Sequence, residues 1–176
     1  MTSSNRLGSG LEEGAELPEE WELGWIEYRE GEAILEMDTA AGALGGPLRA
    51  VVHTREDLEV GEAVRVEVEM LRRHGTATEP YRTTTPLWRD EHLTVCEAPR
   101  RDGFSVSIPL AFLLPFDMDP SSVPPVKKRV WQVVVHRARE KSKFFAEFRI
   151  PVFKTDSSDE RITVEALRLA TEPACH

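Results

Sequence analysis

The stretch Arg129–Phe153, RVWQVVVHRAREKSKFFAEFRIPVF, has the clearest structural pattern in this 176-residue chain. Apolar and polar side chains alternate on both sides of a polar break at Arg137–Ser142. Period-two alternation puts successive side chains on opposite faces of an extended chain, so each half predicts a strand with one buried face. Two such strands joined by a short charged loop predict a β-hairpin. Because its aromatic face must pack against a second sheet, the stretch indicates a mostly β fold.

Several other segments alternate in the same way, and Glu62–Leu71 does so most regularly. Its apolar residues face one side and its charged residues the other, which is typical of an antiparallel sheet with one wet face. The weaker predicted strands are Glu32–Thr39, Leu48–Thr54, Leu87–Val95 and Phe104–Phe112, and Trp21–Tyr28 is either a first edge strand or a stapling segment. A total of about seven to nine strands predicts an immunoglobulin-like antiparallel β-sandwich.

Glycine and proline residues indicate where segments connect the predicted strands. Glycines in Gly42–Pro47 indicate a turn, and Pro109 indicates an edge strand or a bulge because proline lacks an N–H. Pro115–Pro125 predicts a crossing from one sheet to the other. The polar segment Arg72–Pro86 indicates a long loop or a ragged hairpin, and Arg161–Ala170 a final strand or a helix.

Length and charge suggest one domain with short tails. We expect an acidic flexible arm at 1–20, a single β-sandwich domain at 21–172 and a tail at 173–176. Residues 1–40 hold eleven acidic and two basic residues, which equals the net charge of −9 for the whole chain. Residues 126–150 hold eight basic and two acidic residues, so an acidic arm and a basic hairpin have opposite charge. Such segments can attract each other or recruit different partners.

The two cysteines, Cys96 and Cys175, have no CxxC spacing, which disfavours a disulfide network or a zinc site. Whether they pair stays open. The N-terminus has no signal-peptide pattern. The longest uncharged run, Gly103–Phe116, is short and interrupted by two prolines, so no segment is expected to span a bilayer. These features predict a soluble, cytoplasmic protein.

Landmarks along the chain resemble the N-terminal β-sandwich of the arrestin-like fold. They are the turn Gly45–Leu48, the strand Val64–Met70, the run Ile108–Ser122 and the paired strands Val130–His136 and Phe144–Val152. The chain is also similar, over about residues 30–154, to the soluble domain of a bacterial membrane-protein family of unknown function. That similarity rests on Gly31–Thr39, Gly45–Leu48, Leu71–Arg73, Leu87–Glu91, Ile108–Pro115, Val130–Trp131 and Phe148–Phe153.

The resemblance implies a fold and no activity. Members of the bacterial family place transmembrane helices beside this domain, whereas here an acidic arm occupies that place. The chain is either a soluble relative of that family or an excised domain, so membrane anchoring is not carried over to it.

Catalytic and metal-binding patterns are weak. There is no GxSxG motif, and the five histidines show no HxH or HxxxH spacing. A chance cluster of His53 and His136 on neighbouring strands, or a calcium site at Asp117 and Asp119, is the best the sequence offers, and turn or strand roles explain these residues better. We predict no catalytic residue, no cofactor and no metal, and no enzymatic activity.

Basic residues around the predicted hairpin form the most suggestive group. They are candidates for binding an anionic partner such as a lipid headgroup or a phosphopeptide. Nucleic acid is disfavoured because aromatic residues for base stacking are not interleaved with them. The candidate residues are Arg72, Arg73, Lys127, Lys128, Arg129, Arg137 and Arg139. Trp88 is a candidate interface anchor.

The sequence thus predicts a non-enzymatic, adaptor-like or scaffold-like domain that binds a protein partner. A partner with an anionic surface, or one associated with a membrane, is also compatible with the sequence. Two alternatives stay open: a metal-dependent or carbohydrate-active β-sandwich enzyme, and a structural module associated with a membrane partner. The oligomeric state is left open.

Overall fold

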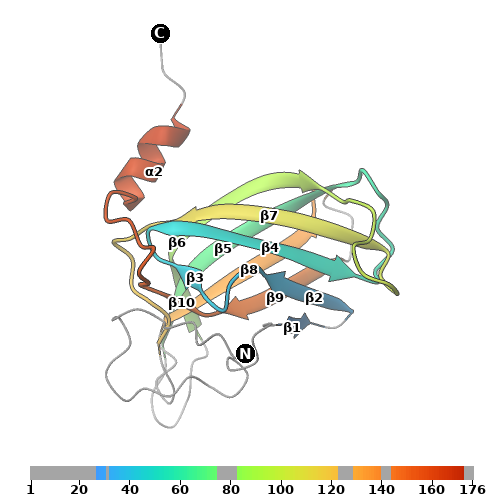
Figure 1. Cartoon of the computed structure of the whole chain (residues 1–176), viewed down its shortest axis with the longest axis horizontal. Helices are drawn as coiled ribbons and strands as arrows, with labels where there is room; N and C mark the ends of the chain where they lie inside the picture. The colour runs from blue at the N-terminus through green and yellow to red at the C-terminus, as the bar shows by residue number, and fades with distance from the viewer. Residues whose placement is uncertain (1–26, 31, 75–82, 123–128, 140–143, 173–176) are drawn as a thin grey trace.

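The computed structural model describes residues 27–30, 32–74, 83–122, 129–139 and 144–172 (Figure 1). The predicted acidic arm (1–20) and the predicted tail (173–176) lie outside these residues. Within them, the chain forms ten strands and one helix.

Two four-stranded antiparallel sheets form the layers of the fold, and they confirm the predicted antiparallel β-sandwich. The first sheet, in spatial order, contains β1 (Glu27–Glu30), β2 (Ala33–Met37), β4 (Gly46–Thr54) and β7 (Val106–Leu114). The second contains β6 (Thr83–Val95), β5 (Ala63–His74), β8 (Arg129–Arg137) and β9 (Phe145–Ile150). A short parallel pair joins β3 (Gly42–Ala43) to β10 (Val152–Phe153).

The core lies between the two sheets and consists of the alternating apolar residues. β5 contributes Val64, Val66, Val68 and Met70, each fully buried. From the hairpin, Trp131, Val133, Val135, Phe148 and Ile150 are buried in the same cluster. Because burying one such aliphatic or aromatic side chain stabilises a fold by about 1.5–3 kcal/mol, this shared face dominates the stability of the sandwich.

Several of the connections between the strands agree with those predicted from the sequence. β8 and β9 pair as the predicted antiparallel hairpin. The predicted crossing at Pro115–Pro125 leads from β7 in the first sheet to β8 in the second, with 123–128 outside the described residues. Pro109 lies on β7, an edge strand, as its missing N–H requires.

The segment Arg72–Pro86 differs in part from the loop interpretation. β5 continues to His74 and β6 begins at Thr83, so both strands extend into it and only 75–82 remain outside the described residues. The backbone ladder pairs Arg72 with Thr85 and His74 with Thr83. Backbone hydrogen bonds hold the two strands together here. Such bonds form without alternating apolar side chains, so the sequence pattern does not reveal these strand ends.

The helix α2 (Val164–Thr171) resolves the alternatives at Arg161–Ala170 in favour of a helix. Thr163 caps its N-terminus by accepting a hydrogen bond from the Ala166 N–H. None of its residues is buried, and in Figure 1 it projects from one end of the sandwich. In the described part of the chain, no helix has the length and apolar character needed to cross a membrane.

Candidate functional site

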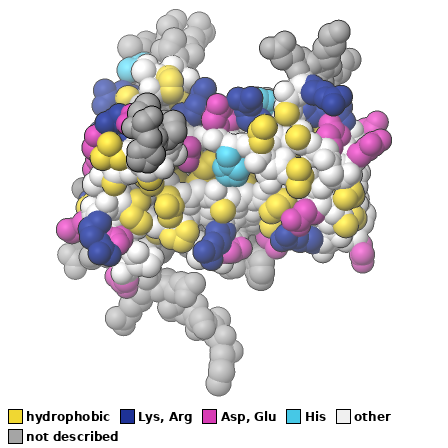
Figure 2. Space-filling view, turned by 90° about the horizontal axis from the view of Figure 1, so that it is seen from above, with side chains coloured by type: hydrophobic (Ala, Val, Ile, Leu, Met, Phe, Trp, Pro, Cys, Tyr) yellow, Lys and Arg dark blue, Asp and Glu magenta, His cyan; other side chains and the backbone are white. Residues whose placement is uncertain are grey.

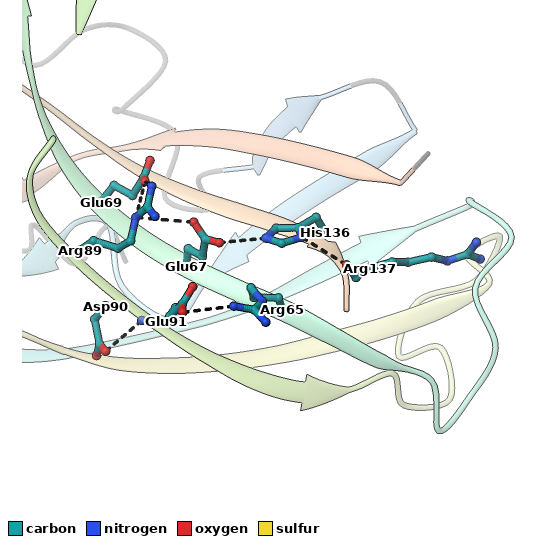
Figure 3. A network of polar contacts seen from close by, with 8 residues as sticks. All are labelled: Arg65, Glu67, Glu69, Arg89, Asp90, Glu91, His136 and Arg137. Atoms are coloured by element: carbon teal, nitrogen blue, oxygen red, sulfur yellow. Dashed lines mark hydrogen bonds and ion pairs between the residues drawn. The ribbon is translucent and has the colours of Figure 1, made fainter. Parts of the chain in front are cut away.

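The outer face of the second sheet carries a network of charged side chains from β5, β6 and β8 (Figure 3). Arg89 on β6 donates to Glu69 on β5 through Nε at 2.7 Å and also through its terminal nitrogen. Gln132 on β8 donates to the other oxygen of Glu69 at 2.7 Å. Glu69 is 6% exposed, so both of its oxygens are satisfied where water has little access. These contacts raise the pKa of Arg89, chiefly through the hydrogen bond to Glu69.

Glu67 stands two residues before Glu69 on the same face. Its carboxylate lies 2.8 Å from Nε2 of His136 on β8 and 3.8 Å from Nε of Arg89. Arg65 and Glu91 form a further pair at 3.1 Å across β5 and β6. Because a buried carboxylate is costly unless it is paired, we interpret this network as a brace that holds β6 and β8 to β5.

A second polar cluster lies on the outer face of the first sheet, where β2, β4 and β7 run side by side. Nδ1 of the buried His53 is 3.0 Å from Oγ of Ser107, and its Nε2 is 3.4 Å from Oε2 of Glu36. Burial, the largest effect, lowers the pKa of His53; Glu36 opposes this, and Arg101 adds to it.

The loop after β6 covers this cluster. The Phe104 ring lies 5.7 Å from the ring of His53, and the guanidinium of Arg55 stacks 4.9 Å over Phe104. The Ser107 hydroxyl accepts a hydrogen bond from the Arg100 N–H at 2.8 Å, and Ser107 is fully buried. A serine, a histidine and an acid occur together in hydrolases, but a nucleophile must reach its substrate. In this structure Ser107 instead anchors the loop to the sheet.

Sequence reasoning did not find the His53 cluster, and no local motif marks it. Glu36, His53 and Ser107 come from three strands and meet only through the strand register, in which His53 pairs with both Ile34 and Ser107. The suggested juxtaposition of His53 with His136 is wrong, because they lie in different sheets.

The candidate basic residues are not gathered in one place. Arg72 and Arg129 are direct neighbours in the register of β5 and β8, whereas Arg137 lies at the opposite end of β8 and Arg139 just beyond it. Arg129 is paired with Asp119 at 2.7 Å and Arg137 with Glu62 at 2.8 Å. Arg73 lies on β5 beside Arg72, and Lys127 and Lys128 lie outside the described residues. Binding of an anionic partner by this set stays a prediction.

Trp88 points inward from β6. Its ring lies 5.7 Å from that of the fully buried Trp131, and it packs against the core while remaining partly exposed. Its role as an interface anchor also stays a prediction.

The aspartates of the crossing have structural partners. Asp117 accepts a hydrogen bond from the Val164 N–H at the start of α2, at 2.8 Å, and Asp119 pairs with Arg129. Among the residues that the structure describes, no group of three or more His, Cys, Asp or Glu side chains is placed to hold a metal ion.

The edge strand β6 of the second sheet exposes three large apolar side chains. Leu93 is 59% exposed and Val95 is 51% exposed, and Leu87 on the same strand is also exposed. Figure 2 looks down on the side where β6 and β7 lie and shows apolar side chains scattered between charged ones. Of the described strands, β5 is the one that pairs with β6.

No protein-family model matches this chain, and no curated protein matches it. Among solved structures, the chain is similar to Spo0M, a sporulation control protein from Bacillus subtilis, with a TM-score of 0.41 and 14% sequence identity. The similar region covers 69% of this chain and 48% of the Spo0M chain, so it spans about half of that protein. A likeness at this level assigns neither a family nor a function to this chain.

Proposed function

We propose that this chain is a non-enzymatic, adaptor-like domain that binds a protein partner along the outer edge of β6, which pairs with β5 alone among the described strands. The observation that carries the proposal is the 13-residue strand β6, which lies at the edge of its sheet and exposes Leu93 and Val95.

Edge strands recognise proteins by accepting one more strand. The backbone hydrogen bonds supply affinity, and alternate side chains supply specificity. An exposed edge with apolar side chains pairs readily with other chains unless it is protected. The first sheet ends in β7, whose Pro109 interrupts the row of donors. β6 has its proline, Pro86, near its start, so the stretch from Leu87 to Val95 retains its donors.

Affinity purification with matched variants tests the proposal. Leu93→Lys places a charge on the β6 face, and Leu169→Lys makes the same change at a residue of α2 with similar exposure. We expect a partner that wild type and Leu169→Lys retain and that Leu93→Lys loses, with all three proteins melting at similar temperatures. Retention of every partner by Leu93→Lys would contradict binding at β6.

The same experiment separates the edge from the basic residues. An Arg72→Glu, Arg129→Glu variant reverses the charge of the one neighbouring basic pair in the register of β5 and β8. If this variant loses the partner and Leu93→Lys keeps it, the binding surface is the basic end of the second sheet. The partner is then of the anionic kind that the sequence suggests.

A further inference from the structure

The backbone of β6 offers one row of hydrogen-bonding groups to a new strand. Cys96, directly after β6, donates its N–H to the Glu62 carbonyl on the β5 side at 2.9 Å. The next residue, Glu97, donates to Ser107 on the opposite side at 2.8 Å. Because these directions alternate along a strand, odd-numbered residues of β6 point their N–H and C=O groups away from β5. These residues include Arg89, Glu91, Leu93 and Val95.

The segment Leu87–Leu93, LWRDEHL, is complementary to itself when it is read in opposite directions about Asp90. We infer that β6 pairs antiparallel with β6 of a second copy of this chain, about a twofold axis at Asp90. The inference rests on the proposed function of the β6 edge and names its partner. In this register Arg89 faces Glu91 of the second copy, and the regular pairing ends before Leu87, where the ladder between β5 and β6 is irregular.

Charge selects this register over its neighbours. A shift by two residues in one direction places Arg89 opposite Arg89, and a shift in the other places Glu91 opposite Glu91. Like charges directly opposite one another destabilise a strand pair, whereas opposite charges stabilise it. The proposed register forms both Arg89–Glu91 pairs. It also places odd residues opposite odd residues, so that the outward N–H and C=O groups of one copy meet those of the other.

The side chains that face the second copy remain within its reach. The side chain of Arg89 is 52% exposed and that of Glu91 is 45% exposed, although each has a partner within its own chain. Each residue can therefore keep its contact to β5 and add one across the axis. The ion pairs of the two outer faces would then join into one continuous row.

Asp90 opposes the pairing and limits its strength. The twofold axis brings Asp90 opposite its own copy, so two carboxylates repel one another. Oδ1 of Asp90 also accepts a hydrogen bond from the Glu91 N–H at 2.9 Å, a donor that the new strand needs (Figure 3). Charge at an edge is a common protection against uncontrolled pairing. Asp90→Asn removes the repulsion, so it should tighten the dimer by about tenfold.

Sedimentation of the full chain over a range of concentrations tests the register. Wild type should dimerise, Asp90→Asn more strongly, and Arg89→Glu or Glu91→Arg alone about tenfold more weakly. An equimolar mixture of the last two variants should recover dimerisation. One chain then carries carboxylates at both positions 89 and 91, and these face the guanidinium groups that the other chain carries at the same two positions.

Thermal melts of each variant show that it is folded. Monomers at every concentration for both wild type and Asp90→Asn would overturn the inference.

Cross-linking gives a readout that does not depend on the charge variants. Opposite residues in a pair without mutual hydrogen bonds have Cα atoms about 4.5 Å apart, which suits a disulfide. Asp90→Cys in a Cys175→Ser background should therefore form a covalent dimer under mild oxidation. Cys96 should not compete, since it is buried and burial raises its pKa to about 11.

Thr94→Cys is the matched control on the same strand and the same face. In the proposed register its two copies lie about 27 Å apart, so it should not cross-link. Equal cross-linking of both variants would overturn the register. If self-association fails while Leu93→Lys still loses a captured partner, only the identity of the partner is wrong and the binding function of β6 stands.

Discussion

His53 is buried between Ser107 and Glu36, and its burial lowers its pKa from the usual value of 6.5. A histidine with a lowered pKa stays neutral in the folded chain while the unfolded chain takes up a proton. The free energy of unfolding should therefore fall as the pH drops through 6.5 towards the lower folded-state pKa. Each pKa unit of difference costs about 1.4 kcal/mol.

Melting temperatures between pH 8 and pH 5 measure this effect. We expect His53→Gln to show a smaller loss of stability on acidification than wild type. His74→Gln, which changes an exposed histidine on β5, should keep the wild-type dependence. Parallel profiles for wild type and His53→Gln would contradict the assignment of the pH dependence to His53.

Gly45 occupies the turn that leads into β4, with φ of +69°. A Cβ at this position would lie 2.4 Å from the Asp159 carbonyl oxygen, and the Gly45 backbone is hydrogen-bonded to both Leu114 and Asp159. Gly45→Ala should therefore lower the free energy of unfolding by about 2 kcal/mol or more, from left-handed strain and from this contact together.

The control for that substitution is Gly103→Ala. Gly103 has φ of +83°, but no atom lies within 4 Å of its added Cβ. Gly103→Ala should lower the free energy of unfolding only by the backbone strain, about 1–2 kcal/mol. Urea denaturation of both variants measures the difference between them. Equal losses would show that the contact with Asp159 contributes nothing.

At the scale of elements, the sequence pattern identifies strands wherever one face is buried and the other is wet. β5 alternates most regularly, because its inner residues fill the core and its outer residues are mostly charged, whereas β8 also buries Val130 and Val134 on its outer face. The ends of β5 and β6 beyond Arg72 and before Leu87 have no such pattern, since the backbone ladder and polar contacts such as that between His74 and Thr85 maintain them. The sequence of α2 is ambiguous because Ile162, Val164 and Ala166 also fit an alternating strand, and none of the helix is buried to decide between the two.

Predicting the candidate sites requires more than predicting the helices and strands, because the sites also depend on how the strands are aligned. Trp88 is recognisable in the sequence as an aromatic residue of a predicted strand, but its inward direction follows from its pairing with the buried Met70 on β5. The basic residues between 127 and 139 are close in sequence, yet Arg129 and Arg137 lie at opposite ends of the nine-residue strand β8. Partners that meet across strands, such as Glu36 with His53, depend on register, and local patterns do not specify register between distant strands.

At the scale of the whole molecule, the edge strands of the two sheets approach each other, β1 near β9 and β6 near β7, without joining the two sheets into one. The segment after β10 supports this sandwich up to a definite point. Asp159 donates its N–H to the Gly45 carbonyl, and Ile162 accepts from the Phe116 N–H. Past Ile162, α2 contributes no buried residue to the core.

Truncation after Ile162 should therefore leave the fold almost as stable as the full chain. We expect the melting temperature to change by less than about 3 °C, because the loss is limited to exposed contacts such as the cap between Asp117 and Val164. Truncation after Lys154 also removes the bonds to Gly45 and Phe116 and should lower the melting temperature by several degrees more. Differential scanning calorimetry of the two truncations compares them directly. If the shorter removal already destabilises the protein strongly, α2 stabilises the sandwich by a contact other than burial in its core.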